Sequence, residues 1–118
     1  MERQSVIEKL SIDFALRIVK LHRYLRVEKR EFVIAKQMYR SGTSIGANIA
    51  ESKAAQSDAD FINKLSIALK EAFETRYWLT LLHESGTIDD IEYDSIENDA
   101  DIIIGTLTNI IKKRKGLA

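Results

Sequence analysis

The five residues GTSIG, Gly42 to Gly46, match the pattern Gly-x-Ser-x-Gly. In an α/β-hydrolase this pattern places a nucleophilic serine, here Ser44, on a strained turn between a strand and a helix. Such a serine needs an acid and then a histidine further along the chain. Only His83 follows, and YRSGTSIGANIAES has the composition of a mid-helix segment. We therefore expect no catalysis by Ser44 and expect that the protein is not an enzyme.

Metal and cofactor chemistry is not indicated by the remaining polar residues. A di-iron site in a helical bundle needs two Glu-x-x-His motifs, but Val19 and Thr80 stand three residues before His22 and His83. The acidic run DDIEYDSIENDAD lacks the central glycine of an EF-hand loop. It is better explained as a solvated face near a helix N-terminus, where negative charge is favourable. We expect no metal, no cofactor and no small-molecule substrate.

The glycines have a second interpretation, which depends on spacing. A small residue recurs every four positions on one side of the expected helix. Each glycine inside a helix costs about 1 kcal/mol relative to alanine, which favours a need for close packing. The predicted helix-packing ridge consists of Gly42, Gly46, Ala50 and Ala54.

Two basic segments are the remaining candidates for a binding function. Residues 1–40 hold ten Lys/Arg against five Asp/Glu, residues 41–111 hold four against thirteen, and the tail KKRKGLA adds four positive charges. Clustered cations contact phosphates, and Tyr24 adds a surface on which bases stack. The alternative is an ordinary solvated surface. The candidate nucleic-acid-binding residues are Arg17, Lys20, Arg23, Arg26, Lys112, Lys113, Arg114 and Lys115, with EKR in the intervening loop as an addition.

Size and composition predict one helical domain spanning residues 1–118. The chain is 45% apolar and 31% charged and has no proline, which suits long helices. The absence of cysteine fits a reducing cytoplasm. The charged start MERQSVIEKL is not typical of a secretory signal, and no apolar run approaches the ~20 residues that span a bilayer. We expect a soluble, cytoplasmic protein without a membrane partner.

Apolar residues recur at three- and four-residue steps in four segments. Ser5 with Glu8 and Ser57 with Asp60 resemble capping boxes, Gly86 suits a helix C-terminus, and Thr87 or Asp89 suits the following start. The predicted helices cover about 5–26, 31–55, 58–84 and 89–114. Short loops between them predict an all-α fold, an antiparallel up-and-down four-helix bundle.

The third predicted helix has apolar residues on two sides. Ile67, Trp78 and Leu81 lie away from its main stripe, beside Lys64 and two glutamates. A helix that is apolar on two sides buries both. A subunit interface is one explanation, since tryptophan is enriched in such interfaces. Coverage by neighbouring loops is the other.

RSGTSIGANIAES, DFINKLSIALKEAFETRYWLTLL and FALRIVKL together resemble the bacterial four-helix bundle family of 23S rRNA intervening-sequence proteins. The resemblance covers nearly the whole chain and implies an up-and-down bundle that assembles into a pentameric ring. Similar bundles are accessory proteins of diversity-generating retroelements, where they associate with a reverse transcriptase and nucleic acid. Those accessory proteins are strongly basic, whereas this chain has zero net charge.

The motifs of this family also imply a set of polar positions, Ser41 among them. We interpret the set as an oligomer interface or a polar network. With the apolar positions of the third helix it comprises Arg40, Asn48, Glu51, Lys64, Ile67, Glu71, Glu74, Trp78 and Leu81.

Sequence and resemblance together predict a non-enzymatic homo-oligomer, with a pentamer as the expected form. Its expected partners are other copies of itself, RNA or single-stranded DNA, and a reverse transcriptase. The alternative is a protein-interaction scaffold without a nucleic-acid role.

Overall fold

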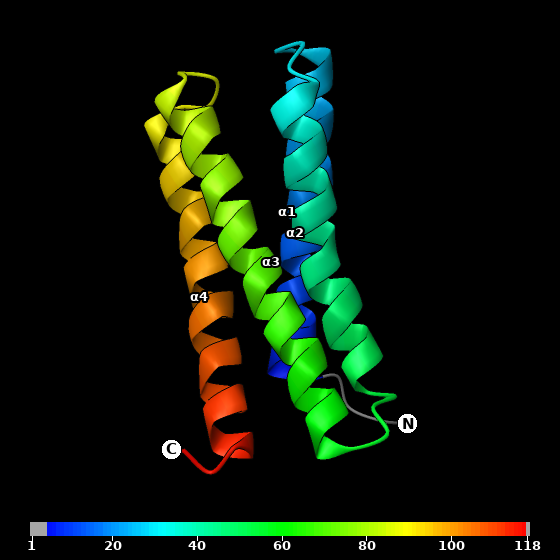
Figure 1. Cartoon of the computed structure of the whole chain (residues 1–118). Helices are drawn as coiled ribbons and strands as arrows, with labels where there is room; N and C mark the ends of the chain where they lie inside the picture. The colour runs from blue at the N-terminus through cyan, green and yellow to red at the C-terminus, as the bar shows by residue number, and fades with distance from the viewer. Residues whose placement is uncertain (1–4, 118) are drawn as a thin grey trace.

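The chain folds into four α-helices and no strands over residues 5–117, the part that the computed structural model describes. The helices are α1 (Val6–Val27), α2 (Val33–Ser52), α3 (Asp58–Glu84) and α4 (Asp90–Arg114). Successive helices run in opposite directions and form an elongated bundle of 44 × 28 × 22 Å (Figure 1). The predicted all-α fold is confirmed. None of the helices in this range has the length and apolar character needed to cross a membrane.

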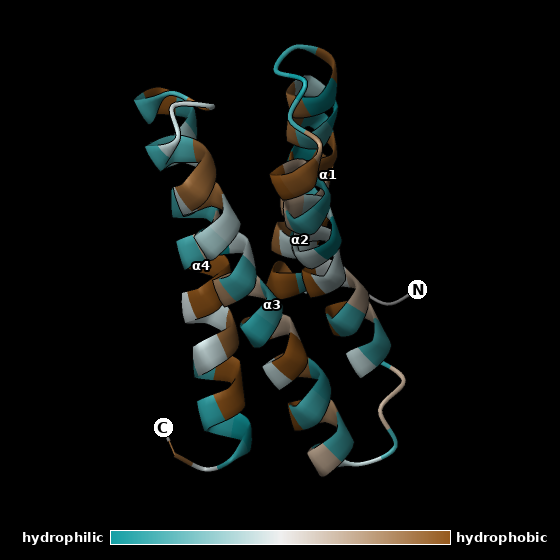
Figure 2. Cartoon of the chain, turned by 45° about the horizontal axis from the view of Figure 1, so that its top comes forward, coloured by the Kyte–Doolittle hydropathy of each residue, from teal (hydrophilic) through white to brown (hydrophobic). Residues whose placement is uncertain are grey.

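One apolar stripe from each helix forms the core, as the alternation of hydropathy along the ribbons indicates (Figure 2). Burial of each large apolar side chain stabilises the fold by about 1.5–3 kcal/mol. The largest fully buried apolar side chains are Phe14, Ile18, Leu25, Met38, Ile45, Leu65, Leu79, Leu82, Ile96, Ile103 and Leu107.

Three helices begin where side-chain caps satisfy their first backbone amides. At α1, Ser5 and Glu8 form a reciprocal capping box. At α3, the Ser57 hydroxyl accepts from the Asp60 amide at 3.0 Å. At α4, the Asp89 carboxylate accepts from the Glu92 amide at 2.8 Å, so Asp89 and not Thr87 is the N-cap. These caps are local interactions, and their positions follow directly from the sequence.

The second helix is shorter than the sequence predicts. It begins at Val33 because the carboxylate of Glu31, outside the helix, accepts from the amides of Ile34 and Ala35 at 2.7 and 3.0 Å. It ends at Ser52, after which the Ala54 amide donates to the Glu51 carbonyl, three residues back. Such tighter bonds commonly close the last turn of a helix. The predicted range of 31–55 therefore includes residues of both flanking turns.

The seam between α1 and α4 is the most loosely packed side of the bundle. Arg17 of α1 bridges it, with nitrogen–oxygen distances of 2.9 Å to Asp99 and 3.4 Å to Glu92 of α4. The first and last helices are thus held together partly by charge, whereas the other neighbouring helices are consecutive and share short turns.

Candidate nucleic-acid interface

Ser44 lies within α2 and not on a strand-to-helix turn. Its hydroxyl donates to the Arg40 carbonyl at 2.7 Å, a bond within the helix. His83 lies at the end of α3, where its Nε2 is 2.6 Å from an Asp90 oxygen. The structure therefore does not place Ser44 on a nucleophile elbow.

The two glycines of the same motif lie where α1 approaches α2. A Cβ at Gly42 would come within 2.8 Å of the Ile18 side chain, and one at Gly46 within 3.4 Å of the Ser11 hydroxyl. Gly42 is buried, so a side chain there would require Ile18 or the helix backbone to shift. Ala50 is exposed, and Ala54 is exposed beyond the end of α2. The close approach thus involves the glycines and not the two alanines of the predicted ridge.

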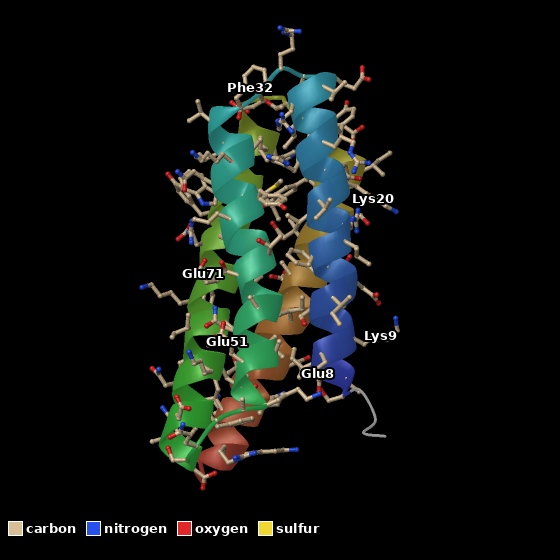
Figure 3. The ribbon with its side chains drawn as sticks, turned by 90° about the vertical axis from the view of Figure 1, so that its right-hand side faces the viewer. Glu8, Lys9, Lys20, Phe32, Glu51 and Glu71 are labelled. Atoms are coloured by element: carbon tan, nitrogen blue, oxygen red, sulfur yellow. The ribbon has the colours of Figure 1, made fainter. Side chains whose placement is uncertain are left out.

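Charged residues link the outer surfaces of α2 and α3. Arg40 forms ion pairs with Glu71 at 3.3 Å and with Glu74. The Trp78 indole donates to Glu74 at 3.0 Å, and this bond, together with Arg40, lowers the pKa of the Glu74 carboxyl. The same carboxylates raise the pKa of Arg40, Glu74 foremost through its hydrogen bond. Figure 3 shows Glu71 on this side of the bundle.

Further along the same two helices, Glu51 pairs with Lys64 at 3.1 Å, on the side of the bundle where Figure 3 labels Glu51. The Asn48 amide donates to the Ser44 carbonyl at 2.9 Å. Ser41 is buried, and its hydroxyl lies 2.8 Å from that of Thr75. These polar residues therefore make contacts within one subunit.

The apolar positions of α3 outside the core remain partly accessible. Ile67, Trp78 and Leu81 are half-buried, and the neighbouring Phe73 and Tyr77 are exposed. Tyr77 and Trp78 pack edge to face, with ring centroids 5.0 Å apart. This side of α3 is an aromatic surface that a second molecule can cover.

The two basic segments lie at opposite ends of the bundle. The C-terminal part of α1 lies beside the start of α4, where Arg17 meets Glu92. The end of α4 instead lies beside the start of α3, where Arg114 meets Asp58 at 2.8 Å (Figure 1). The structure therefore does not bring these cations together into one patch.

One cation of each predicted segment is engaged inside the molecule. Arg17 is paired with the two α4 carboxylates described above. Arg114 pairs with Asp58, and its guanidinium lies 4.0 Å from the centroid of the Phe61 ring. Both arginines would have to leave these contacts in order to bind a phosphate. Their roles in the structure are helix–helix contacts.

The other cations of both segments are exposed and form no ion pair with any residue in the described range. At the end of α1 these are Lys20, Arg23 and Arg26, and at the end of α4 they are Lys112, Lys113 and Lys115. Figure 3 shows Lys20 on the outward side of α1. Free cations are available for external phosphates, and each end offers three from the predicted set.

The α1 end carries more than the predicted cations. Lys29 and Arg30 in the turn are exposed, and the Lys29 ammonium lies 5.9 Å from the centroid of the Tyr24 ring. Phe32 projects at the end of the bundle (Figure 3) and is 53% exposed. Phe32 falls inside the predicted second helix, 31–55, and is not among the predicted binding residues. An aromatic residue directly after the charged run EKRE was the available signal.

A groove of about 440 Å³ opens between this end of α1 and the start of α4. Its floor includes Leu21 and Ile88, and its walls carry opposite charges, Lys20 against Asp89. The opposite walls neutralise each other, which disfavours a strongly anionic small ligand. No group of three or more His, Cys, Asp or Glu residues within the described part of the chain is arranged to hold a metal ion.

The adjoining α3–α4 end is acidic and carries His83. The His83 ring stacks on Tyr93 with centroids 4.2 Å apart. Its bond to Asp90 raises the pKa of the imidazole, to which Glu84 and Asp94 also contribute. The same bundle end therefore has one basic and one acidic corner.

Comparisons with known proteins agree with this architecture. The family model of the 23S rRNA-intervening sequence protein matches residues 3–109. A crystal structure of a protein of unknown function from the S23 ribosomal protein family of Bacteroides thetaiotaomicron VPI-5482 is similar, with 56% sequence identity and a TM-score of 0.90. The similarity covers 91% of this chain and 99% of that one. A comparison with curated proteins gives no match. The chain belongs to the 23S rRNA-intervening sequence protein family.

Proposed function

We propose that this protein is a non-enzymatic homo-oligomeric bundle that binds a nucleic acid, alone or in a nucleoprotein, through the basic end of α1. The observation that carries the proposal is the group of free cations there. Lys20, Arg23 and Arg26 are exposed and form no ion pairs with described residues, whereas Arg17 and Arg114 are tied to carboxylates. Cations without internal partners release their counterions when a phosphate binds, and this release drives nucleic-acid association.

Oligomerisation supplies the affinity that one small patch lacks. The aromatic surface of α3, with exposed Phe73 and Tyr77 beside half-buried Trp78, is the proposed contact between copies. Several copies of one weak patch on a single assembly bind a long nucleic acid with avidity. The family resemblance favours a ring of five subunits. Light scattering on the eluting protein tests this, with an expected mass near five times 13.5 kDa.

Binding is tested by fluorescence anisotropy with labelled RNA and single-stranded DNA over a range of salt concentrations. The triple variant Lys20→Ala, Arg23→Ala, Arg26→Ala should bind at least tenfold more weakly and with a smaller salt dependence, by about one unit per lost phosphate contact. The control Lys112→Ala, Lys113→Ala, Lys115→Ala removes the same charge from the opposite end. Equal loss in both triple variants would contradict a specific site at α1.

A protein-interaction scaffold is the second candidate, favoured by the same exposed aromatic surface of α3. In that case the wild-type protein forms the oligomer but binds neither RNA nor single-stranded DNA at low salt. A reverse transcriptase is the protein partner that the resemblance suggests. Co-purification of the two proteins, with and without nuclease, separates direct protein contact from bridging by nucleic acid.

A further inference from the structure

The turn that joins α1 to α2 exposes two aromatic side chains among free cations. We call residues 20–33 the α1–α2 tip. Tyr24 is 43% exposed and Phe32 is 53% exposed. Aromatic side chains contribute most to stability when they are buried. Two exposed aromatic side chains at one bundle end therefore leave a large apolar area in contact with water. The Lys29 ammonium adjoins the Tyr24 ring at 5.9 Å, which places a cation beside an aromatic face.

The tip also contains one residue type that its backbone does not favour. Arg30 has a φ of 53°, in the left-handed region where glycine or asparagine is preferred. Phe32 is the N-cap residue of α2 and makes no side-chain capping bond, because the Glu31 carboxylate accepts from the amides of Ile34 and Ala35 in its place. Local preferences are most often violated where a side chain serves a function. Arg30 is therefore held in an unfavoured conformation with an exposed side chain of a type that binds nucleic acid, and exposed Phe32 lies two residues further on.

The charges at this bundle end direct a polyanion to the tip. Lys20, Arg23, Arg26, Lys29 and Arg30 are exposed, and none forms an ion pair with another described residue. Exposed Glu28 and Asp89, which faces Lys20 across the groove, offset part of this charge, so Arg23, Arg26, Lys29 and Arg30 carry the positive excess. The Glu31 carboxylate is occupied in capping α2. On the neighbouring α3–α4 corner, exposed Asp89, Asp90 and Asp94 repel phosphates. A nucleic acid at this end therefore follows the α1–α2 tip.

From these observations we infer that the α1–α2 tip binds single-stranded nucleic acid, with phosphates on its cations and bases stacked on Phe32 and Tyr24. The inference rests on the proposed function and specifies its ligand. A duplex keeps its base faces stacked inside the helix and offers only phosphates to the tip. A single strand offers both, and base–aromatic stacking adds affinity with little dependence on sequence.

The experiment compares a labelled single-stranded oligonucleotide with the duplex of the same sequence, using the full-length protein and anisotropy at low salt. The wild-type protein should bind the single strand more tightly. Phe32→Ser should weaken single-strand binding about tenfold and leave duplex binding within about twofold. The substitution should preserve folding, because Phe32 is 53% exposed and the Glu31 carboxylate still caps α2. Ile91→Ser is the matched control, since Ile91 is 83% exposed on the acidic corner and should leave both affinities unchanged.

Three outcomes would overturn the inference, and only one of them also removes the proposed function. Equal binding of strand and duplex, unaffected by Phe32→Ser, would leave a cationic site without stacking. Absence of binding to either nucleic acid would end the proposed function itself. Exposed Val27 and Val33 beside the cations raise a third outcome. If Phe32→Ser abolished binding to phosphatidylserine vesicles but altered neither nucleic-acid affinity, the tip would be a membrane contact.

Discussion

Two turns at the same end of the bundle have equal length but differ in the charged residues at and around them. Residues 28–32 join α1 to α2, and residues 85–89 join α3 to α4. Each turn contains a residue with positive φ, Arg30 at 53° and Gly86 at 77°. The first turn holds two cations and two glutamates and follows the exposed Arg23 and Arg26, whereas exposed Asp89, Asp90 and Asp94 lie at the second turn.

The α3–α4 turn satisfies its local requirements with suitable residue types. The Gly86 amide donates to the His83 carbonyl and the Thr87 amide to the Leu82 carbonyl, both at 2.9 Å, which is the Schellman arrangement. Asp89 then caps α4. The α1–α2 turn has arginine in place of glycine and phenylalanine at the N-cap. The comparison indicates that glycine ends α3 without strain, whereas Arg30 keeps an exposed cation in a left-handed conformation at a cost in stability.

Among these variants, Gly86→Val is expected to change the free energy of unfolding most. A Cβ at Gly86 would meet no atom within 4 Å, so the loss comes from the backbone alone. A β-branched residue at a φ of 77° should lower the free energy of unfolding by about 2 kcal/mol. Urea denaturation measures the change. Gly86→Asn is the control, because asparagine tolerates this conformation, and an equal loss there would point to a cause other than φ.

Asp89→Ala should have the next largest effect. The change removes the carboxylate that accepts from the Glu92 amide, and loss of such a cap costs about 1 kcal/mol. Thermal unfolding of the two proteins measures the difference. Asp89→Ser keeps a capping oxygen and should recover most of the stability; a variant as unstable as Asp89→Ala would show that the cap is not the cause.

Arg30→Gly should change stability in the opposite direction. Glycine relieves the strain of the left-handed conformation in the folded state, but it also gives the unfolded chain more conformational freedom. The net result should be a rise of about 0.5 kcal/mol in the free energy of unfolding. The variant should also bind nucleic acid more weakly, because it loses one cation. A gain in stability together with a loss of binding would support a functional reason for the arginine. If Arg30→Gly were less stable than the wild type, Arg30 would not be strained in the folded protein.

The smallest change in stability is expected from the titration of His83 with pH. Its folded pKa is raised by Asp90, so the stabilisation is fully present below the ordinary pKa of about 6.5 and is lost as pH rises through the raised value. The Asp90 side chain is 88% exposed, so screening by solvent keeps the effect small. Thermal unfolding from pH 5 to 9 should show it.

Asp90→Asn is the variant that isolates this effect, since it should flatten the part of the pH profile that His83 contributes. His22 contributes in the opposite direction, because burial, aided by Arg26, lowers the pKa of its imidazole. Identical profiles of wild type and Asp90→Asn would exclude the His83–Asp90 pair as a source of pH dependence.

Local sequence signals predicted most of the helix ends. Ser5, Ser57, Asp89 and Gly86 lie at or beside helix ends as expected, because caps depend on residues within about four positions. The start of α2 was not predicted because Glu31, a residue common inside helices, caps it from outside. Its end at Ser52 has no strong sequence signal in the run that follows.

The candidate site was predicted less completely. The cations at the end of α1 were identified from composition, but the tail cations belong to the other end of the molecule. Phe32 was overlooked because a single exposed aromatic residue in sequence looks the same as a buried one. Exposure depends on which neighbours cover a side chain, and periodicity alone does not report this for a residue beside a turn.

The sequence by itself determined four amphipathic helices, their approximate ends and the family, because these depend on short-range spacing and contiguous motifs. Only the tertiary structure decided which charges remain available. Arg17 and Asp99 are 82 positions apart in the chain and meet at 2.9 Å across the α1–α4 seam. Arg114 is likewise held by Asp58, 56 positions away. A cation is free or neutralised according to its partners in space, and that long-range pairing exists only once the helices have packed.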